Sequence, residues 1–398
     1  MSTDHPHGWP VVAYEARPWA RSGDEITSRR RSRLITGEYR AAVPPEIRRL
    51  VVELEPDVLA AADEASHALA RFDAEAGSFI APFSAILLRT ESSSSSEVEN
   101  LTAGAKQVAL AEIGASRSEN ARLIVANTRA MDAALALSAN LDEEAVIAMH
   151  AALLEESAPR MVGGWREEQV WIGGGALSPH DAEFVPPHHD RVPDLMSDLL
   201  DFIDRTDVPV LAQAAIAHAQ FETIHPFPDG NGRTGRALIH AMLHRGGLTK
   251  NLTVPVSAGL LHVPQKYFDA LSDYRTGDVD AIVHAIAYAA FDAIGNGRRL
   301  VEDMESVRAR WKETLRARSD STVHRLMDEL LGKPVVTVRM AAQTLGVSET
   351  AAGTAINRLA DDGILTQAAG GARYRIWQAP DVIDALDAFA ERARRGRV

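Results

Sequence analysis

The chain has 398 residues, which is enough for two or three domains that each bury a core. Its hydrophobic content of 46% and charged content of 24% are those of an ordinary globular protein. The absence of cysteine excludes disulfides, zinc–thiolate sites and cysteine nucleophiles, and the net charge of −13 argues against broad electrostatic binding to nucleic acid.

The N-terminal segment begins MSTDHPHGWP and has neither the basic start nor the apolar stretch of a signal peptide. We therefore expect a cytoplasmic location. Residues 1–45 show no regular pattern and carry large aromatic side chains among prolines and arginines. This predicts an irregular arm whose aromatic residues pack onto the main body: Trp9, Tyr14, Trp19 and Tyr39.

Residues 45–77 place apolar side chains three and four apart and stop at a glycine, which predicts a helix. Helical character continues from about residue 81 to residue 156. Within this region lies TESSSSSEVEN, residues 90–100, whose serine run is by composition typical of a solvated linker. The alternative is a segment that acts on another part of the chain, because the run ends in two glutamates and lies between helices.

Residues 163–187, GGWREEQVWIGGGALSPHDAEFVPP, lack the helical periodicity of the segments before and after them. Two short β-like runs, around residues 170–172 and 184–185, flank a turn rich in glycine and proline. This pattern predicts a β-hairpin with a long tip.

Helices are predicted again from residue 192 to about residue 317, broken by HPFPDGNGR and by LTVPVSAGLLHVP. The segment 281–294 is interrupted by His284 and Asp292 and is shorter than the roughly 18 residues that a membrane span needs. It predicts a buried core helix, and we expect no membrane association. The fold class is therefore mainly α, with one hairpin and a small C-terminal β element.

The last eighty residues change pattern again. A helix, a turn at Gly346, a second helix opened by Ser348 and two β-like runs separated by Gly370-Gly371 form the outline of a winged helix-turn-helix. Residues 320–378 hold six Lys or Arg and six Asp or Glu, a balance that is poor for phosphate contacts. Two arginines of the predicted wing leave DNA binding open beside a protein-interaction or regulatory role.

The segment HPFPDGNGRTGR, residues 225–236, combines the features of a polyphosphate site. One helix stops at Pro226 and another begins near Asn231–Gly232, so glycines at the mouth of the second helix leave N–H groups free to bind an anion. Arg233 and Arg236 are three residues apart on one face of this helix, and arginine forks suit phosphate oxygens.

A carboxylate beside such a site would repel phosphate, so Asp229 predicts a Mg²⁺ ion that bridges it to the phosphates. His225, at the entrance of the loop, has an imidazole that can take a proton near neutral pH. The residues therefore indicate a polyphosphate site with a base beside it.

The same loop resembles the signature of the Fic (filamentation induced by cAMP) family, His-Pro-Phe-x-(Asp/Glu)-Gly-Asn-Gly-Arg-x-x-Arg, and every specified position is present. The resemblance implies a Fic-type helical bundle that transfers AMP from ATP to a Ser, Thr or Tyr hydroxyl of a protein. In the Doc-like branch of the family, which acts as a protein kinase, a lysine stands where this chain has Gly232. AMP transfer is therefore favoured.

The resemblance also implies roles for single residues. His225 would deprotonate the target hydroxyl as it attacks the α-phosphorus, and Phe227 would be buried and anchor the loop. Asp229 would hold the Mg²⁺ that joins the α- and β-phosphates. The other positions would bind the phosphates of ATP: Asn231 with the amides around Gly230 and Gly232 at the α-phosphate, Arg233 at the β-phosphate and Arg236 at the γ-phosphate.

Fic enzymes also carry a β-hairpin flap that pins the target peptide by main-chain pairing, and the predicted hairpin of residues 163–187 fits this description. An ordinary surface hairpin is the alternative. Tyr267 falls where the family places adenine-pocket residues, and a core or surface tyrosine is the alternative there.

Residues 95–100, SSEVEN, match the inhibitory motif of the family, (Ser/Thr)-x-x-x-Glu-(Gly/Asn). On a helix Ser95 and Glu99 are one turn apart and face the same way. In the subclass that this chain resembles, the inhibitory helix precedes the catalytic core, and its glutamate pairs with the second arginine of the loop, here Arg236. The resemblance implies that this pairing removes the γ-phosphate clamp, so that ATP binds non-productively. The serine stretch is thus interpreted as a brake.

Together these features predict three domains: residues 1–110 with the inhibitory motif, residues 111–300 as the Fic core and residues 318–398 as the winged helix. The predicted function is a self-inhibited adenylyltransferase that uses ATP and Mg²⁺ on an unidentified target protein or on itself. The alternative is a winged-helix transcription regulator that uses the Fic core as a nucleotide sensor. Homodimer formation and the removal of AMP stay open.

Overall fold

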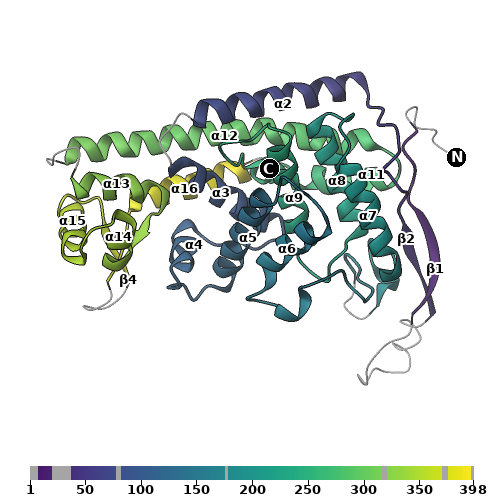
Figure 1. Cartoon of the computed structure of the whole chain (residues 1–398), viewed down its shortest axis with the longest axis horizontal. Coiled ribbons are helices and arrows are strands. Elements are labelled where there is room, and N and C mark those ends of the chain that lie inside the picture. The colour runs from purple at the N-terminus through teal and green to yellow at the C-terminus, as the bar shows by residue number, and fades with distance from the viewer. Residues whose placement is uncertain are drawn as a thin grey trace. The chain divides into compact units, whose positions relative to one another are not determined.

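The computed structural model of the chain describes residues 8–19, 37–77, 82–174, 178–315, 321–369 and 375–395. The described chain is mainly helical, as predicted, with one two-stranded and one three-stranded antiparallel sheet (Figure 1). Across these ranges, every helix is too short or too polar to cross a membrane.

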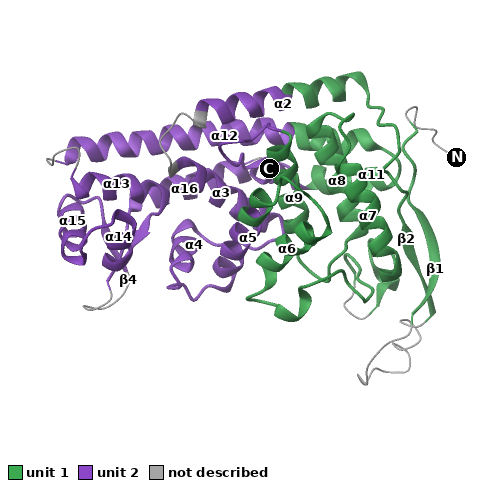
Figure 2. Ribbon diagram, viewed as in Figure 1, with its two compact units in different colours: residues 1–64, 132–246, 265–287 green, residues 65–131, 247–264, 288–398 purple. Residues whose placement is uncertain are grey.

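The chain forms two compact units, each assembled from segments that are distant in sequence (Figure 2). Unit 1 comprises residues 1–64, 132–246 and 265–287, and unit 2 comprises residues 65–131, 247–264 and 288–398. Because contacts rather than chain order define these units, the three consecutive domains that the sequence suggested stay a prediction.

Unit 1 begins with two antiparallel strands, β1 (Ala13–Trp19) and β2 (Gly37–Val43), which pair along their whole length. The prediction of an irregular arm over residues 1–45 is therefore wrong for these strands. Tyr39 and Ala41 are buried on one face of β2, with an exposed arginine between them. Ala42, on the opposite face, is buried too, so both faces of this part of β2 are covered. The prolines and arginines of the segment obscured the strands in the sequence.

The expected packing of the N-terminal aromatic residues is confirmed for three of the four. Trp9 and Tyr39 are buried, and the Trp19 ring meets the Tyr39 ring edge-on with 5.9 Å between centroids. Tyr14 is 44% exposed, with the Arg40 guanidinium over its ring. Aromatic side chains on one face therefore hold the two strands in place.

The first helix, α2, covers Pro56–Gly77 rather than the predicted residues 45–77. Proline suits the first turn of a helix because its missing N–H would have no intrahelical acceptor there. The preceding segment bonds to a side chain instead, since Asp198 accepts from the N–H groups of Ile47 and Arg48 at 2.6 and 3.2 Å. A tertiary partner thus decides the conformation of a segment that periodicity alone assigned to the helix.

Unit 1 also holds helices α6 (Glu143–Leu154), α7 (Val192–Ile203), α8 (Val210–Ile224), α9 (Asn231–Arg245) and most of α11 (Pro264–Arg275). Short 3-10 turns lie at Pro159–Met161, Pro179–Asp181 and His189–Arg191. Every side chain of α8 from Leu211 onward is buried, so this helix forms the centre of the unit. Both α7 and α9 pack on α8, and α6 packs on α9, which sets the loop between α8 and α9 against α6.

Unit 2 holds α3 (Pro82–Val98), α4 (Ala105–Glu112), most of α5 (Glu119–Ala136) and the short α10 (Val256–Leu260). With α6, these helices confirm the helical character predicted for residues 81–156. The long helix α12 (Val279–Thr314) belongs to unit 1 up to Ala287 and to unit 2 from Tyr288, and it contains the predicted core helix of residues 281–294. Gly259 lets α10 approach α12 closely, because a Cβ atom there would collide with the Ala289 carbonyl.

The C-terminal segment has the element order that the sequence predicted. These elements are α13 (Thr322–Gly332), β3 (Val335–Val336), α14 (Val338–Leu345), α15 (Glu349–Asp361), β4 (Thr366–Ala369), β5 (Ile376–Gln378) and α16 (Pro380–Arg394). Gly346 turns the chain with φ of 64°, and the Ser348 hydroxyl caps α15 by accepting from the Ala351 N–H. The strands align in the order β3-β5-β4, and the predicted turn at Gly370-Gly371 lies outside the described residues.

Ion pairs tie β1 to the segment that precedes α7. Arg191 donates to both carboxylate oxygens of Glu15 at 2.9 and 2.7 Å, and Arg17 donates to one of them at 2.9 Å. The hydrogen bond from Arg191, supported by the one from Arg17, lowers the pKa of Glu15 from 4.5 to about 2. The N-terminal strands are therefore fixed to the body of unit 1 by charge as well as by aromatic packing.

We predict that Glu15→Gln lowers the free energy of unfolding at pH 7, and that this loss shrinks as the pH falls from 4.5 to about 2. The carboxylate has the lower pKa in the folded chain, so its contribution is complete above the unfolded pKa and disappears as the folded group takes its proton. Urea unfolding at pH 7 and pH 3 measures the difference. The exposed Glu38→Gln on β2 is the matched control, and equal losses in both variants would contradict the assignment.

Candidate functional site

The segment between α8 and α9 forms a tight loop whose shape is set at its first residue. His225 adopts the left-handed conformation, with φ 52° and ψ 60°, and its N–H donates to the Phe221 carbonyl at 2.8 Å. Among the described non-glycine residues only His225 and Asn100 have a positive φ. Pro226 then prevents the helix from continuing. The imidazole is therefore presented at the end of α8.

Arg166, which lies in the predicted hairpin of residues 163–187, holds this turn in place. Its buried guanidinium donates to the main-chain carbonyl oxygens of His225 at 2.8 Å, Glu168 at 2.9 Å and Pro187 at 2.5 Å. Its own N–H donates to the Pro226 carbonyl at 2.9 Å. Burial lowers the pKa of Arg166 to about 10, so the side chain stays charged at neutral pH. One cation therefore ties both ends of the predicted hairpin to the loop.

Phe227 is fully buried and anchors the loop, as expected. The ring of His150, from α6, stacks on it with 3.7 Å between centroids and parallel planes, and Trp165 lies 5.2 Å away. The Nε2 of His150 donates to the Asp229 carbonyl at 3.0 Å. Burial lowers the pKa of His150, which keeps the ring neutral with its proton on Nε2. Helix α6 thus fixes the middle of the loop.

Asn231 closes the loop on itself. Its side-chain oxygen accepts from the Phe227 N–H, and its side-chain nitrogen donates to the Phe227 carbonyl, both at 2.9 Å. Both groups of the side-chain amide are thus used inside the loop. The side chain that the resemblance places at the α-phosphate therefore also shapes the loop. Its role at the α-phosphate stays a prediction.

Glycine is required at the mouth of α9. Gly230 has a φ of 78°, a conformation that other residues rarely adopt, and a Cβ atom there would lie 2.9 Å from the Leu153 side chain. The first N–H groups of a helix have no intrahelical acceptor and carry the positive end of its dipole. With the half-buried Gly232 in its first turn, the N-terminus of this 15-residue helix suits an anion.

The charged residues of the loop differ in exposure. The Asp229 side chain is 62% exposed and lies 3.9 Å from the Arg233 guanidinium, whose side chain is 6% exposed. Arg236 is only 1% exposed. Two buried guanidinium groups in the first two turns of α9 thus create a positive site next to an exposed carboxylate.

The imidazole of His218, in α8, and that of His225, just after α8, lie in different surroundings. The Nδ1 of His225 has the Glu222 carboxylate beside it, with the Oε2 at 3.8 Å. The fully buried His218 instead bonds through Nε2 to the Tyr267 hydroxyl at 2.8 Å. Burial, and then the charge of Arg236, lowers the pKa of His218 to about 3, so this ring is neutral. Tyr267 is itself buried, which favours the interpretation as a core tyrosine.

The predicted hairpin of residues 163–187 is reduced to one isolated antiparallel bridge, between Ile172 and Phe184. The prediction of two strands is therefore wrong in extent, although the two β-like runs do pair. Residues 175–177, in the predicted tip, lie outside the described residues. Among the residues of this segment that the structure describes, a regular ladder is missing because glycines and prolines next to the bridge interrupt it.

Strand β2 supports this hairpin from one side. The Ala42 N–H donates to the Val185 carbonyl at 3.0 Å, and Ala42 shares a small apolar cluster with Phe184. The rings of Trp19 and Trp171 meet edge-on with 5.5 Å between centroids. The N-terminal strands, which the sequence did not reveal, therefore support the hairpin of the candidate site.

The serine run of residues 90–100 is mostly helical and buried in α3, so its interpretation as a solvated linker is wrong. The serine hydroxyls bond within the helix, since Ser92 donates to the Leu88 carbonyl at 2.9 Å and Ser96 to the Ser92 carbonyl at 2.8 Å. Asn127 of α5 donates to the Ser92 carbonyl at 2.9 Å. Small side chains thus let α5 approach the backbone of α3.

Helix α3 ends one residue before Glu99, so this carboxylate lies past the helix rather than on it. Asn100 has a φ of 61° and donates its N–H to the Glu97 carbonyl at 2.8 Å, while the Leu101 N–H donates to the Ser96 carbonyl at 3.0 Å. These are the two bonds of a Schellman motif. The last position of the inhibitory motif is therefore a helix terminator, for which glycine and asparagine are suited.

The two residues of the inhibitory motif differ in exposure, since Ser95 is fully buried and Glu99 is exposed. Both belong to unit 2, whereas the loop that carries Arg236 belongs to unit 1. The pairing of Glu99 with Arg236 stays a prediction.

Sequence reasoning missed three residues of the site: His150, Arg166 and Glu222. A histidine inside the otherwise apolar stretch AVIAMHAALL was an available signal for His150, because buried polar groups need a partner. Glu222 precedes His225 by three positions, so helical spacing could have placed the two together. Arg166 had no local signal, since most of its acceptors are carbonyl groups far along the chain.

Known proteins share this site region. Residues 140–243, which include α6, the hairpin, α8 and most of α9, match the model of the Fic/DOC family. The chain is 34% identical over 121 residues to a probable protein adenylyltransferase of Aquifex aeolicus (strain VF5), covering 29% of this chain and 32% of that protein. It is also 34% identical over 133 residues to the protein adenylyltransferase Fic of Aedes aegypti, covering 32% of this chain and 23% of that protein. The chain thus aligns with a third or less of the length of these curated relatives.

Among solved structures, a Fic family protein from Desulfovibrio desulfuricans G20 resembles this chain with a TM-score of 0.53 and 22% identity. The match covers 82% of this chain and 97% of that chain. At this level of identity the likeness shows a shared fold. It confirms the predicted Fic-type, mainly helical architecture.

We predict that Arg166→Lys lowers the free energy of unfolding by roughly 1–3 kcal/mol, because an ammonium group cannot reach all the carbonyl oxygens that the planar fork satisfies. Urea unfolding measures this loss. The exposed Arg160→Lys, from the same region, is the matched control. If Arg166→Lys is no less stable than the control, Arg166 does not hold the loop.

Proposed function

We propose that the protein transfers AMP from ATP to a serine, threonine or tyrosine hydroxyl of a protein, which can be the chain itself, because residues 140–243 match the model of the Fic/DOC family. The observation that carries this proposal is the loop between α8 and α9. It joins an imidazole to the N-terminus of a helix with two buried arginines. The names of the curated relatives support the reaction type.

In this reaction the target hydroxyl oxygen attacks the α-phosphorus, the bond to the bridging oxygen of the β-phosphate breaks, and pyrophosphate leaves. His225 accepts the hydroxyl proton. Its side chain is 20% exposed, so a target side chain can reach it. The Glu222 carboxylate near Nδ1 favours the tautomer that leaves Nε2 as the base.

The phosphates bind at the start of α9 in this proposal. The first-turn N–H groups and the helix dipole stabilise negative charge there. Arg233 and Arg236 supply guanidinium forks for the β- and γ-phosphates. Since these residues are 5% and 1% exposed, their charges act in a low-dielectric environment, where they stabilise a transition state more strongly than in water.

Asp229 would hold a magnesium ion beside the phosphates. Mg²⁺ commonly binds one or two carboxylates and completes its shell with phosphate oxygens and water. The exposed carboxylate next to Arg233 fits this donor set. In the part of the chain that the structure describes, no group of three or more His, Asp or Glu side chains could hold a metal ion by itself. The bound ion would neutralise charge on the phosphates during transfer.

The target segment would add as a strand to the hairpin. Ile172 uses its N–H and its carbonyl on Phe184. In an antiparallel pair, successive residues direct their main-chain groups to opposite edges, so an incoming strand would pair along the edge of this segment that faces away from Phe184. Support from β2 on the far side of the hairpin would keep this edge in place.

Self-inhibition is part of the proposal. Glu99 would pair with Arg236 and so occupy the place of the γ-phosphate. The exposed position of Glu99 on the terminator turn of α3 suits a group that can leave its partner without unfolding the helix. The signature match of residues 95–100 supports this assignment.

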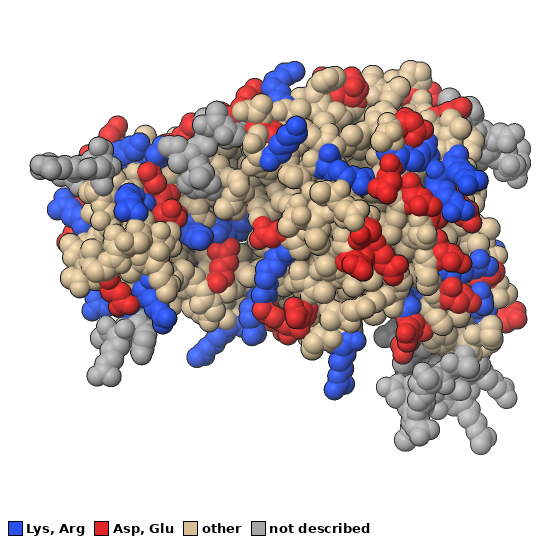
Figure 3. All heavy atoms as spheres, viewed as in Figure 1, with Lys and Arg blue, Asp and Glu red and all other residues tan. Residues whose placement is uncertain are grey.

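A transcription regulator with a nucleotide-sensing core is the second candidate. The helix–turn–helix of α14, Gly346 and α15, followed by the pair β4 and β5, favours it. However, α15 carries a single basic residue, Arg358, which donates to Asp362 at 2.8 Å. On the face drawn in Figure 3, acidic and basic side chains are intermixed. These observations favour the enzyme over the regulator.

We predict that Glu99→Gly raises AMP transfer by roughly 5- to 150-fold, the usual range of coupling between two sites, because it removes the competitor of the γ-phosphate. Mass spectrometry of the intact protein after incubation with ATP and Mg²⁺ measures the adenylyl increment. The double variant Glu99→Gly/His225→Ala and the omission of Mg²⁺ should abolish it. The matched control is Glu313→Gly, an exposed glutamate near the end of α12.

Two outcomes would contradict different parts of this proposal. If Glu99→Gly transfers AMP no faster than the wild-type chain, the proposed inhibition by Glu99 is wrong. If neither protein transfers AMP to itself or to proteins of a host lysate, the proposed activity is wrong.

If the chain is a transcription regulator, it should bind DNA and shift its band on a native gel. We expect no sequence-specific shift of the DNA upstream of the gene at about 150 mM salt, because α15 lacks the basic residues that bind phosphates. A specific shift that Arg358→Ala abolishes would favour the regulator.

A further inference from the structure

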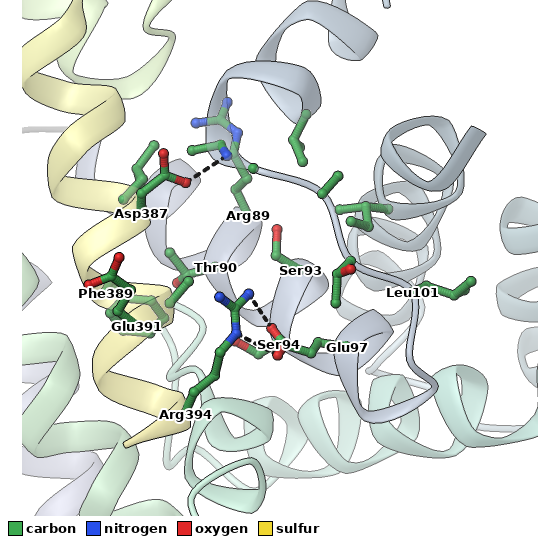
Figure 4. Close-up of a pocket in the computed structure, with 18 residues that line it drawn as sticks. Arg89, Thr90, Ser93, Ser94, Glu97, Leu101, Asp387, Phe389, Glu391 and Arg394 are labelled. Atoms are coloured by element: carbon green, nitrogen blue, oxygen red, sulfur yellow. Dashed lines mark hydrogen bonds and ion pairs between the residues drawn. The ribbon is translucent and has the colours of Figure 1, made fainter. Parts of the chain in front are cut away.

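Unit 2 contains a cavity behind the inhibitory segment that the proposed reaction does not use. Its volume is about 520 Å³, within the usual range of roughly 300–1,000 Å³ for small-molecule sites. Figure 4 shows α3 and α16 on two sides of this cavity, with Arg394 and Glu97 at one end and Asp387 at the other. The third wall is the segment of residues 101–105.

The cavity is lined by one face of α3, and its lining includes neither Ser95 nor Glu99. Thr90, Ser94 and Glu97 line the cavity and are spaced four and three residues apart, so they share one face of the helix. Glu99 follows Glu97 by two positions, lies one residue past the last residue of α3 and is exposed. The cavity carboxylate and the proposed inhibitory carboxylate are therefore separated by a single residue at the end of α3.

Negative charge exceeds positive charge in this cavity. Arg394 donates to both carboxylate oxygens of Glu97 at 2.6 and 2.8 Å. The other lining cation, Arg89, is already bonded to the Glu112 carboxylate at 2.5 and 2.9 Å. Two more carboxylates line the cavity, Asp387 and Glu391. One guanidinium thus faces three carboxylates.

Charge and shape together define the class of ligand. The side chain of Glu97 is 8% exposed, so a cation that replaced Arg394 there would meet a largely desolvated carboxylate. Apolar side chains complete the lining, among them Leu101, Val108 and Phe389. A hydroxyl group, that of Ser93, also lines the cavity (Figure 4). These features suit a molecule with a cationic head and an apolar body.

We propose that this cavity is a regulatory site for a small organic cation, an amine or a guanidine with an apolar body. The cationic group of the ligand binds beside the carboxylates of Asp387 and Glu391. It also replaces Arg394 as the partner of the Glu97 carboxylate. This exchange loosens the hold of α16 on the last turn of α3, which carries Glu99. The regulatory consequence, relief of the brake, rests on the proposed function, whereas binding does not.

Calorimetric titration of the full chain with agmatine and with phenethylamine, at constant ionic strength, tests the binding. Phenethyl alcohol is the matched neutral probe. We expect both cations to bind and the alcohol to bind at least about tenfold more weakly, since the site recognises charge. No heat from either cation at millimolar concentration, or equal binding of the alcohol, would overturn the proposal.

Variants locate the binding site. Asp387→Asn/Glu391→Gln should weaken binding of the cations about tenfold, while Asp384→Asn, an exposed charge on the same helix, should not. The first substitution keeps a side-chain oxygen for the Ala105 N–H, which Asp387 accepts at 2.9 Å, and equal melting temperatures check the fold. Unchanged affinity in the double variant would show that the cations bind elsewhere and would overturn the assignment.

An activity measurement then separates this site from the proposed function. A bound cation should raise AMP transfer by the wild-type chain and leave Glu99→Gly unchanged, because that variant has no brake to release. If the cation binds in the cavity and transfer by the wild-type chain does not rise, the regulatory role is wrong. If Glu99→Gly shows no transfer without the cation, the proposed function fails and the binding result stands by itself.

Discussion

A helix that stops inside a protein must find donors for its last carbonyl oxygens. Helix α8 stops inside unit 1, at the residue proposed as the base, and Arg166 supplies donors to the carbonyl groups around that stop. A guanidinium can do this because its planar fork holds several donors in fixed directions. The position of the His225 imidazole therefore depends on one buried cation, Arg166.

Other side chains of the site also hold the loop by hydrogen bonds to its main-chain groups. His150 holds the Asp229 carbonyl, and the side chain of Asn231 holds both main-chain groups of Phe227. With its shape fixed in this way, the loop can keep Arg233 and Arg236 buried in the first turns of α9. Such preorganisation lets charges stabilise a reaction without rearranging when it occurs.

The segment of residues 90–100 combines contacts that build the fold with the residues that we propose to inhibit the enzyme. Its serines bond to their own helix and let α5 come close, while Asn100 ends the helix with a Schellman motif. The turn that results carries Glu97 toward the cavity and Glu99 toward the surface. In our proposal, a ligand bound beside Glu97 would therefore affect Glu99.

The sequence by itself determined that a tight loop follows α8, that α9 starts at Asn231, that the chain turns at Gly346 and that the fold is mainly helical. These features depend on neighbours along the chain and on periodicity. Only the tertiary structure decided that the N-terminal strands pair and that the serine run is buried. It also placed Arg166 against His225, 59 residues away in the sequence. Burial and main-chain pairing depend on distant partners, and no local pattern records which partners those are.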